Sequence, residues 1–430
     1  MTSVTHVRLQ PGVQLTAVHT NKFKSSYLSV CFLAALDEQS AAANALLPQV
    51  LRRGCRRCPD MQSIAAQLDE LYGGVIEPLV TKKGETQCVG FAASFLDDAY
   101  ALNGEDILLP AARLLGELLL DPATENGVFR ADYVEGERAN LIDQIRAQRN
   151  DKRSYSMLRL AQEMCPGEAY GVDKLGSESR AAAITPQSLW RQYRQLLNQS
   201  EVHIYYCGSA DVARVKQVME TAFAALPVSE ERVKPVCQVR SHPAADRPRV
   251  VEEVLDVTQG KLAIGLRTGG ICVQDQEYPA LLLLNAVFGG TSMSKLFMNV
   301  RERLSLCYFA SSSLEKMKGL MVVSSGIEFD KYQQARDEIL AQLDACRRGD
   351  ITPDELEGAR RIVITALRTT LDSQSRMADY WLGQAVANLE ETPEQLAGRL
   401  EQVTAEQAVA AAGRLEPDTI YFLKGKEGAK

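Results

Sequence analysis

Histidine is scarce in this chain, and its scarcity limits the metal chemistry that the sequence can support. The 430 residues include four histidines, His6, His19, His203 and His242. None is followed three or four residues later by a second histidine or a glutamate. A zinc site built from two histidines one helical turn apart is therefore excluded.

Long apolar runs, basic runs and an export signal are also lacking. The longest apolar run lies around residues 280–288 and is too short to span a bilayer. The net charge is −7 and no basic cluster stands out, which argues against a nucleic-acid partner. The first residues, MTSVTHVRLQPGVQL, contain no basic segment followed by an apolar one, so we expect no secretory signal and no membrane association.

Cysteine is present but is not arranged as a disulfide or zinc framework. Ten cysteines are scattered along the chain, and the one close pair is Cys55 and Cys58. A single CxxC without a second pair favours coincidence over zinc or redox chemistry, although a metal site built from cysteines stays open as an alternative. Ten thiols in a chain without an export signal predict reduced cysteines and a cytoplasmic location.

The second half of the sequence repeats the first, which indicates two domains of one topology. Three pairs of segments recur in the same order at offsets near half the chain length: 134–138 with 356–360, 45–54 with 280–289, and 184–206 with 403–422. Residues 227–248 carry several prolines and show no sustained periodicity, which is typical of a linker. We therefore predict α+β domains at 1–226 and 249–430, joined by this linker.

One stretch, GGTSMSKLFMNVRERLSLCY at Gly289–Tyr308, carries the candidate binding residues. Its two glycines and a threonine indicate a turn and an N-cap, followed by a helix over Ser292–Arg303 and a strand over Leu304–Ser313. This order could aim the Arg301 guanidinium and the Tyr308 phenol into one cleft. The alternative is that Arg301 is a solvated helix cap and Tyr308 a half-buried strand residue.

The same stretch resembles the C-terminal-half signature of the M16 (pitrilysin/insulinase-like) peptidases. That signature is Gly-Gly, a Ser-rich turn, Leu-Phe, then Arg-Glu-x-x-Gly-Leu-x-Tyr, and Ser305 stands here at the last Gly. The resemblance extends over essentially the whole chain. It implies an α+β fold of two homologous α/β-sandwich domains, M16 metallopeptidase-like (LuxS/MPP-like), arranged as a clamshell around a peptide. It also implies that Arg301 and Tyr308 contact the peptide backbone.

The zinc site of the active family members does not survive in this sequence. The resemblance, aligned on Gly54, places Ala45 and Gln49 at the two His ligands, Pro48 at the Glu that acts as general base, and Gln144 at the third ligand. Alanine has no donor atom, proline cannot act as a base, and amides are poor zinc ligands. The segment ALLPQVL instead predicts a packing helix interrupted by Pro48.

A peptidase fold without its metal implies a partner. Small M16 enzymes are often pairs in which the subunit without zinc lends its Arg and Tyr to a shared cavity. The resemblance therefore implies no catalytic residue, no cofactor bound by this chain, and no independent activity. It implies a zinc-binding M16 homologue as partner in a heterodimer, or a self-dimer, with a peptide as substrate. The alternative is a non-hydrolytic peptide-binding or scaffold protein, for example in translation-factor maturation or in a membrane respiratory complex.

Overall fold

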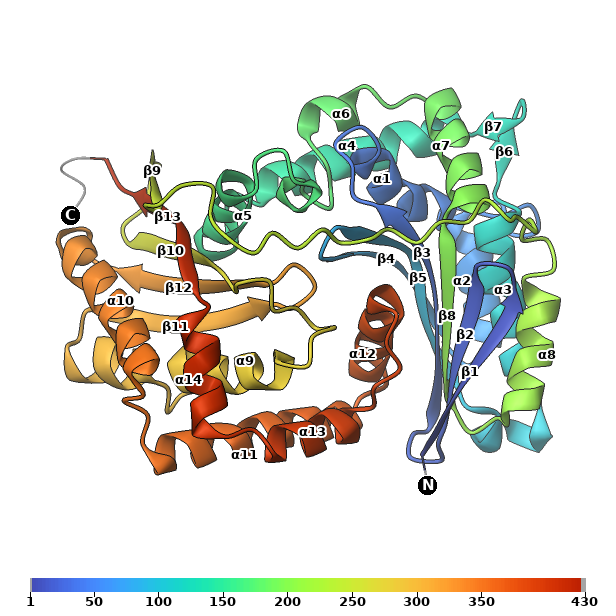
Figure 1. The fold of residues 1–430 in the computed structure, drawn as a ribbon. Helices are drawn as coiled ribbons and strands as arrows, with labels where there is room; N and C mark the ends of the chain where they lie inside the picture. Colours follow the sequence, from blue (N-terminus) through green and yellow to red (C-terminus); the bar gives the residue numbers. More distant parts are fainter. Residues whose placement is uncertain (1, 427–430) are drawn as a thin grey trace. The chain divides into compact units, whose positions relative to one another are not determined.

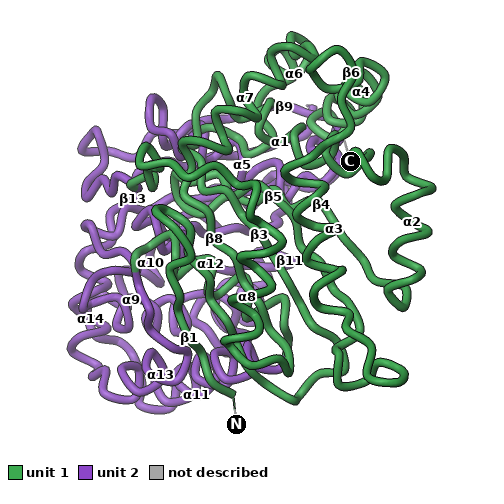
Figure 2. Tube along the Cα trace, turned by 90° about the vertical axis from the view of Figure 1, so that its right-hand side faces the viewer, with its two compact units in different colours: residues 1–146, 172–236, 373–388 green, residues 147–171, 237–372, 389–430 purple. Residues whose placement is uncertain are grey.

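The computed structural model describes residues 2–426, which form two compact units with one main sheet each. Figure 2 colours them separately. Unit 1 comprises the residues up to Arg146, Val172–Val236 and Ser373–Asn388, and unit 2 comprises Ala147–Gly171, Cys237–Asp372 and the residues from Leu389 onward.

The sheet of unit 1 has six strands in the order β1-β2-β8-β3-β5-β4. The strands are β1 (Ser3–Gln10), β2 (Val13–His19), β3 (Ser25–Ala35), β4 (Val75–Lys83), β5 (Thr86–Leu96) and β8 (Glu201–Gly208). Strands β2 and β8 run parallel, and the other neighbours are antiparallel. One face packs on α1 (Ala41–Leu51), α3 (Leu108–Leu120), α7 (Pro186–Gln199) and α8 (Val212–Ala222) to form the apolar core of this unit.

The sheet of unit 2 repeats this topology with five strands in the order β11-β12-β10-β13-β9. The strands are β9 (Arg249–Val254), β10 (Gly260–Arg267), β11 (Cys307–Glu315), β12 (Leu320–Ile327) and β13 (Glu416–Lys424). Strands β9 and β13 run parallel, as β2 and β8 do, and the remaining pairs are antiparallel in both units. Without β1, the two orders are identical, which confirms the predicted pair of α/β domains with one topology.

The remaining helices follow the start signals in the sequence. The longer ones are α2 (Met61–Glu70), α4 (Ala131–Ala147), α9 (Tyr278–Asn285), α10 (Tyr332–Arg348), α11 (Pro353–Thr370), α13 (Pro393–Glu401) and α14 (Ala405–Gly413). Thr185 and Thr352 each accept a backbone N–H three residues on, with proline at the first helical position, so α7 and α11 begin where the capping pattern predicts. The expected interruption of α1 is wrong, because this helix continues through Pro48 to Leu51.

Two helices pack on the sheet of the opposite half of the sequence. Helix α5 (Lys152–Met164) belongs to unit 2, where Tyr155 and Leu160 pack with Ala263 and Tyr421. Helix α12 (Gln374–Ala387) belongs to unit 1, and Figure 1 shows it on the other side of that sheet from α3 and α8. The compact units therefore depart from the continuous ranges 1–226 and 249–430 at these two segments.

Apolar contacts explain why α12 joins unit 1. Leu382 and Val386 pack against Cys31, Leu33 and Cys88, which line the sheet face that the other helices of this unit leave uncovered. The segment 147–171 is held in unit 2 in the equivalent way, and ionic contacts add to its apolar ones. Each half of the sequence thus supplies one helix that completes the other half's unit.

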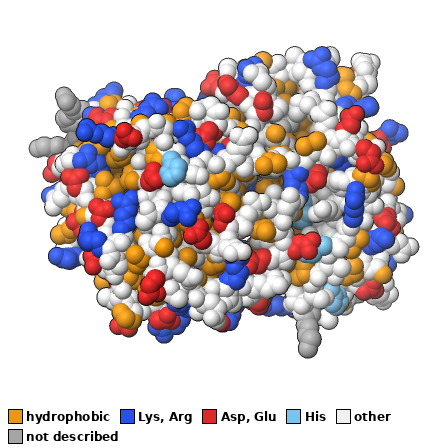
Figure 3. Space-filling model, viewed as in Figure 1, with side chains coloured by type: hydrophobic (Ala, Val, Ile, Leu, Met, Phe, Trp, Pro, Cys, Tyr) orange, Lys and Arg blue, Asp and Glu red, His pale blue; other side chains and the backbone are white. Residues whose placement is uncertain are grey.

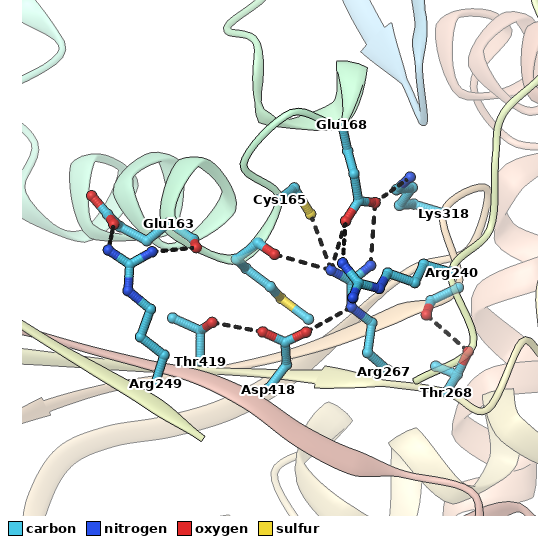
Figure 4. Close-up of polar contacts among 12 residues, drawn as sticks. Glu163, Cys165, Glu168, Arg240, Arg249, Arg267, Thr268, Lys318, Asp418 and Thr419 are labelled. Atoms are coloured by element: carbon cyan, nitrogen blue, oxygen red, sulfur yellow. Dashed lines mark hydrogen bonds and ion pairs between the residues drawn. The ribbon is translucent and has the colours of Figure 1, made fainter. Parts of the chain in front are cut away.

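A buried ionic cluster fixes the end of the segment that contains α5. Glu168 follows this helix and accepts from Arg267 on β10 at 2.9 Å and from Lys318 at 2.7 Å. Arg267 also donates to Asp418 at 2.8 Å, and Arg240 lies 3.8 Å from Glu168 (Figure 4). The side chains of Arg267 and Lys318 are 0% and 1% exposed, so these cations are compensated by the two carboxylates instead of by water.

The surface carries charges of both signs. Figure 3 shows acidic and basic side chains interspersed over the visible face, with no extended region of one sign. None of the ten cysteines forms a disulfide. Over residues 2–426, no helix combines the length and the apolar character that crossing a membrane requires.

Candidate functional site

The four positions that the sequence predicts at the family's zinc site lie on α1 and α4 of unit 1. Ala45 is 2% exposed, Pro48 is also buried, and Gln49 is half-buried. This stretch of α1 therefore packs mainly into the apolar core of unit 1. Gln144 lies on α4 and is exposed. The two helices are therefore present, and their side chains at the predicted positions offer no zinc-ligand chemistry.

An ion pair links α4 to the end of α1. The Arg53 guanidinium lies 3.2 Å from the Glu137 carboxylate and 5.1 Å from the centre of the Tyr133 ring. Asn140 donates to the same carboxylate at 3.0 Å. Glu137 therefore already has an arginine and an amide as partners.

The residues present do not fit a zinc ion. Ala45 and Pro48 offer no ligand atom, and Gln49 and Gln144 offer neutral amides where zinc takes imidazole, thiolate or carboxylate. Within residues 2–426, no group of three or more His, Cys, Asp or Glu side chains is arranged to hold a metal. At the CxxC pair, the N–H of Cys58 donates to the Cys55 sulfur at 3.3 Å, and burial raises the pKa of Cys55, which favours its neutral thiol.

Arg301 lies on a π-helix and not on the α-helix that the sequence predicts. The π-helix spans Leu296–Arg303, and the N–H of Leu304 donates to the carbonyl of Asn299, five residues earlier, at 3.1 Å. Such segments are rare and often lie at functional sites. The Arg301 guanidinium stacks 4.6 Å above the centre of the Phe297 ring. Its side chain is 40% exposed, and within residues 2–426 it pairs with Glu302 at 3.3 Å, so donor capacity remains for a ligand.

Tyr308 lies at a β-bulge on the edge strand β11. Cys307 pairs with Ile327 and Phe309 with Gly326, so two steps along β11 face one step along β12, and Tyr308 is the extra residue. Its side chain is 63% exposed. A bulge reorients side chains relative to the sheet, and bulges are frequent beside active sites. The half-buried tyrosine of the alternative interpretation does not describe this residue, which the bulge presents to solvent.

Ser305 joins the two elements in a left-handed conformation. Its φ is +49°, and its N–H donates to the carbonyl of Arg301 at 3.1 Å while Leu306 donates to Val300 at 3.0 Å. A glycine usually ends a helix in this way, because it has no Cβ to clash. Serine therefore adopts the backbone conformation that the family's glycine suits better. We call Arg301, Ser305 and Tyr308 together the bulge site.

Replacing Ser305 with glycine is expected to stabilise the protein. A non-glycine residue in this conformation costs about 1–2 kcal/mol, and the greater freedom of glycine in the unfolded chain offsets part of that gain. Since Ser305 is exposed, few contacts are lost. We expect Ser305→Gly to raise the free energy of unfolding by about 0.5–1 kcal/mol in chemical denaturation. Ser305→Ala is the control and should give no gain, and a less stable glycine variant would contradict the strain argument.

Two cations that sequence reasoning missed lie next to the bulge site. The Arg153 guanidinium is 4.3 Å and the Lys261 ammonium 5.9 Å from the centre of the Phe309 ring. The sequence signals a polar break at 150–153 but not that this break meets β10 and β11, which lie more than a hundred residues away. We call Arg153 and Lys261 the cation pair.

Comparison with known proteins places these features in a family. Residues 183–363 match the family described as "Peptidase M16 inactive domain". The chain is 35% identical over 418 residues to "Probable inactive metalloprotease YmfF" of Bacillus subtilis (strain 168), and the match covers 97% of each protein. It is 24% identical over 252 residues to "Uncharacterized zinc protease YmxG" of the same organism, covering 57% of this chain and 58% of that protein.

Solved structures show the same fold. A conserved protein from Enterococcus faecalis V583 superposes with a TM-score of 0.89 at 27% identity, covering 99% of both chains. A peptidase M16 inactive domain from Pseudomonas fluorescens superposes with a TM-score of 0.80 at 18% identity, covering 100% of this chain and 99% of the other. The fold extends over the whole length of both relatives, including the segments that carry the substituted metal positions and the bulge site.

Proposed function

We propose a function from the premise that this chain belongs to the M16 peptidase family and is an inactive homologue. In our proposal the chain is the non-catalytic subunit of a heteromeric zinc peptidase. In this role it lends Arg301 and Tyr308 to a peptide-binding cavity that it shares with a zinc-binding M16 homologue. The observation that carries the proposal is the contrast between the two sites. None of the four residues predicted at the metal site suits zinc, whereas a π-helix and a bulge leave the Arg301 side chain 40% exposed and Tyr308 63% exposed.

The chemistry of the two side chains suits this role. A guanidinium donates to the carbonyl oxygens of an extended peptide, and a tyrosine hydroxyl can stabilise the negative charge that develops on a carbonyl attacked beside a partner's metal. A relative named as an inactive metalloprotease and another named as a zinc protease both occur in Bacillus subtilis, which supports the idea that the two kinds of chain coexist. We also propose a cytoplasmic location, because ten cysteines without a disulfide suit a reducing compartment.

Substitutions at the bulge site test the proposal in the assembled pair. Arg301→Ala and Tyr308→Phe are each expected to lower kcat/KM for a peptide by about ten- to hundred-fold, because each removes a hydrogen bond to the reacting peptide. Arg303→Ala is the matched control, since Arg303 is an exposed arginine on the same π-helix. The ratio of the two subunits in size-exclusion chromatography should not change. Unchanged turnover in both variants would refute the proposed role.

The partner is the second point to test. Purification of the tagged chain from its own cells should recover, at near one-to-one stoichiometry, a homologue that carries His-x-x-Glu-His. Recovery of the chain with partners that lack this motif would favour the non-hydrolytic peptide-binding or scaffold role.

A further inference from the structure

The cation pair sits on one aromatic ring beside the bulge site. Arg153 is in the first turn of α5, and Lys261 is on β10, the central strand of the sheet of unit 2. Both face Phe309, the residue that follows Tyr308. The ring itself lies over Gly326, since a Cβ on that glycine would approach it to 2.6 Å. The sheet therefore presents an aromatic ring with two cations close to it.

Carboxylates compensate this pair only from a distance, since Asp151 favours the charged form of Lys261 without an ion pair to it. Among residues 2–426, neither cation has an ion pair within 4.0 Å. Arg153 instead donates to the Ser311 hydroxyl at 3.3 Å, and Lys261 donates to the side-chain oxygen of Gln259. The neighbouring acid, Asp151, caps α5 by accepting from two backbone N–H groups and one hydroxyl.

The pKa of the lysine reflects this imbalance. Burial lowers the pKa of Lys261, the positive charge of Arg153 lowers it further, and the carboxylate of Asp151 offsets only part of this lowering. A negative group placed between the two cations would relieve both effects, because it replaces lost hydration and offsets the repulsion. Hydroxyl donors are close as well, since Ser311 lies on β11 and pairs with Ser324 on β12. The local chemistry thus suits a carboxylate, which accepts from both cations and from hydroxyls.

We propose that the cation pair binds a carboxylate of the peptide held at the bulge site, so that acidic peptides are the substrate class. The inference rests on the proposed function, because it takes the bulge site to hold a peptide. The carboxylate can come from an Asp or Glu side chain or from the C-terminus of the peptide. Phe309 follows Tyr308 directly on the edge strand β11, and the bulge at Tyr308 interrupts the alternation of side chains there. We therefore place a peptide that contacts Tyr308 within one or two residues of the pair.

Three matched peptides test the preference on the full chain. All carry a tetramethylrhodamine label at the N-terminus and one extended decapeptide sequence. The first has a central Gln and a C-terminal amide, the second a central Glu and the amide, and the third the Gln with a free C-terminal carboxylate. Fluorescence anisotropy should give a Kd at least fivefold lower for the second or the third peptide than for the first. Which of the two binds more tightly identifies the source of the carboxylate.

Variants assign the preference to the pair. Arg153→Glu should abolish or invert it, while the affinity for the neutral peptide stays within twofold. Lys261→Met should also abolish it. Lys261 lies on the central strand, so Lys261→Met can fail to fold. Arg153 is exposed, so Arg153→Glu should fold and still test the proposal. Lys152→Gln, at the preceding position, is the matched control and should keep the preference.

The outcomes separate the inference from the function on which it rests. Equal affinity for all three peptides, with binding that Arg301→Ala weakens, would overturn the acidic preference and leave the proposed function standing. No binding of any of the three peptides by this chain would overturn the inference, whereas the proposed function, in which the cavity is shared with a partner, is judged by the turnover of the assembled pair. A preference that survives Arg153→Glu would place the carboxylate elsewhere and overturn the assignment to this pair.

Discussion

Replacing Arg267 with methionine is expected to lower the free energy of unfolding by about 3–5 kcal/mol, because it leaves two largely buried carboxylates without their shared cation. The Arg267 side chain is fully buried and donates to Glu168 at 2.9 and 3.3 Å, to Asp418 at 2.8 Å and to the backbone carbonyl of Met164 at 3.0 Å. Lys318 remains beside Glu168 in the variant, but nothing replaces the guanidinium at Asp418. Methionine fills much of the volume, so the loss reports mainly on the unpaired charges.

The pH dependence of this loss follows from Glu168. Burial by itself would raise the pKa of this carboxyl, but the hydrogen bonds from Arg267 and Lys318 outweigh it and hold the pKa below its ordinary value. A carboxyl with a depressed pKa in the folded state contributes stability above its unfolded pKa of about 4.3, and this contribution disappears as the pH falls through the folded pKa. The difference between the native protein and Arg267→Met should therefore be complete at neutral pH and narrow below about pH 4.

Urea unfolding followed by circular dichroism measures both effects. Arg240→Gln is the matched control, because Arg240 belongs to the same cluster but is 44% exposed and lies 3.8 Å from Glu168. We expect its effect to stay below about 0.5 kcal/mol, as is usual for exposed pairs. If the free energy of unfolding of Arg267→Met lies within about 1 kcal/mol of the native value, which is the usual effect of a single substitution, the cluster does not stabilise this part of unit 2.

The sequence predicts the repeated topology because the repeat is local. Each half carries its own capping signals, such as Thr185 and Thr352, and its own alternating strands, and equal patterns fold into equal sheets. The exchange of α5 and α12 between the units leaves no such signal. It depends on pairs such as Glu168 with Arg267 that are 99 residues apart and that no periodicity connects.

The sequence likewise predicts only part of the candidate site. The order of Arg301 and Tyr308 on a helix and a following strand can be predicted from Gly289–Tyr308 alone. The π-helix and the bulge cannot, because each depends on one extra residue whose place is set by packing against neighbouring elements. The positive φ of Ser305 cannot be predicted from the sequence either, because glycine and not serine is the residue that indicates a left-handed backbone.

Because α12 comes from the second half of the chain and packs in unit 1, we expect that the first half does not fold alone. A fragment of residues 1–236 lacks α12, whose Leu382 and Val386 cover one face of the sheet of unit 1 and whose Trp381 packs edge-on against His6 with ring centres 5.2 Å apart. Burying each of these three side chains contributes about 1.5–3 kcal/mol. Gln374 adds hydrogen bonds to Ser25 at the start of β3 and to the backbone of Cys207 near the end of β8. Because the free energy of unfolding of a domain is only about 5–15 kcal/mol, losing the helix removes much or all of that stability.

Appending the missing helix should restore the fold. A fragment of residues 1–236 is expected to bind a hydrophobic dye and to show no cooperative thermal transition. The same fragment joined through a Gly-Ser linker to residues 373–388 should unfold cooperatively, because the sheet regains the contacts of Gln374 with Ser25 and the backbone of Cys207 as well as the apolar ones. A control with Leu382→Asp and Val386→Asp in the appended helix should not be rescued. Cooperative unfolding of the unmodified fragment would mean that unit 1 needs no helix from the second half, and that the exchange serves the assembled protein instead of its folding.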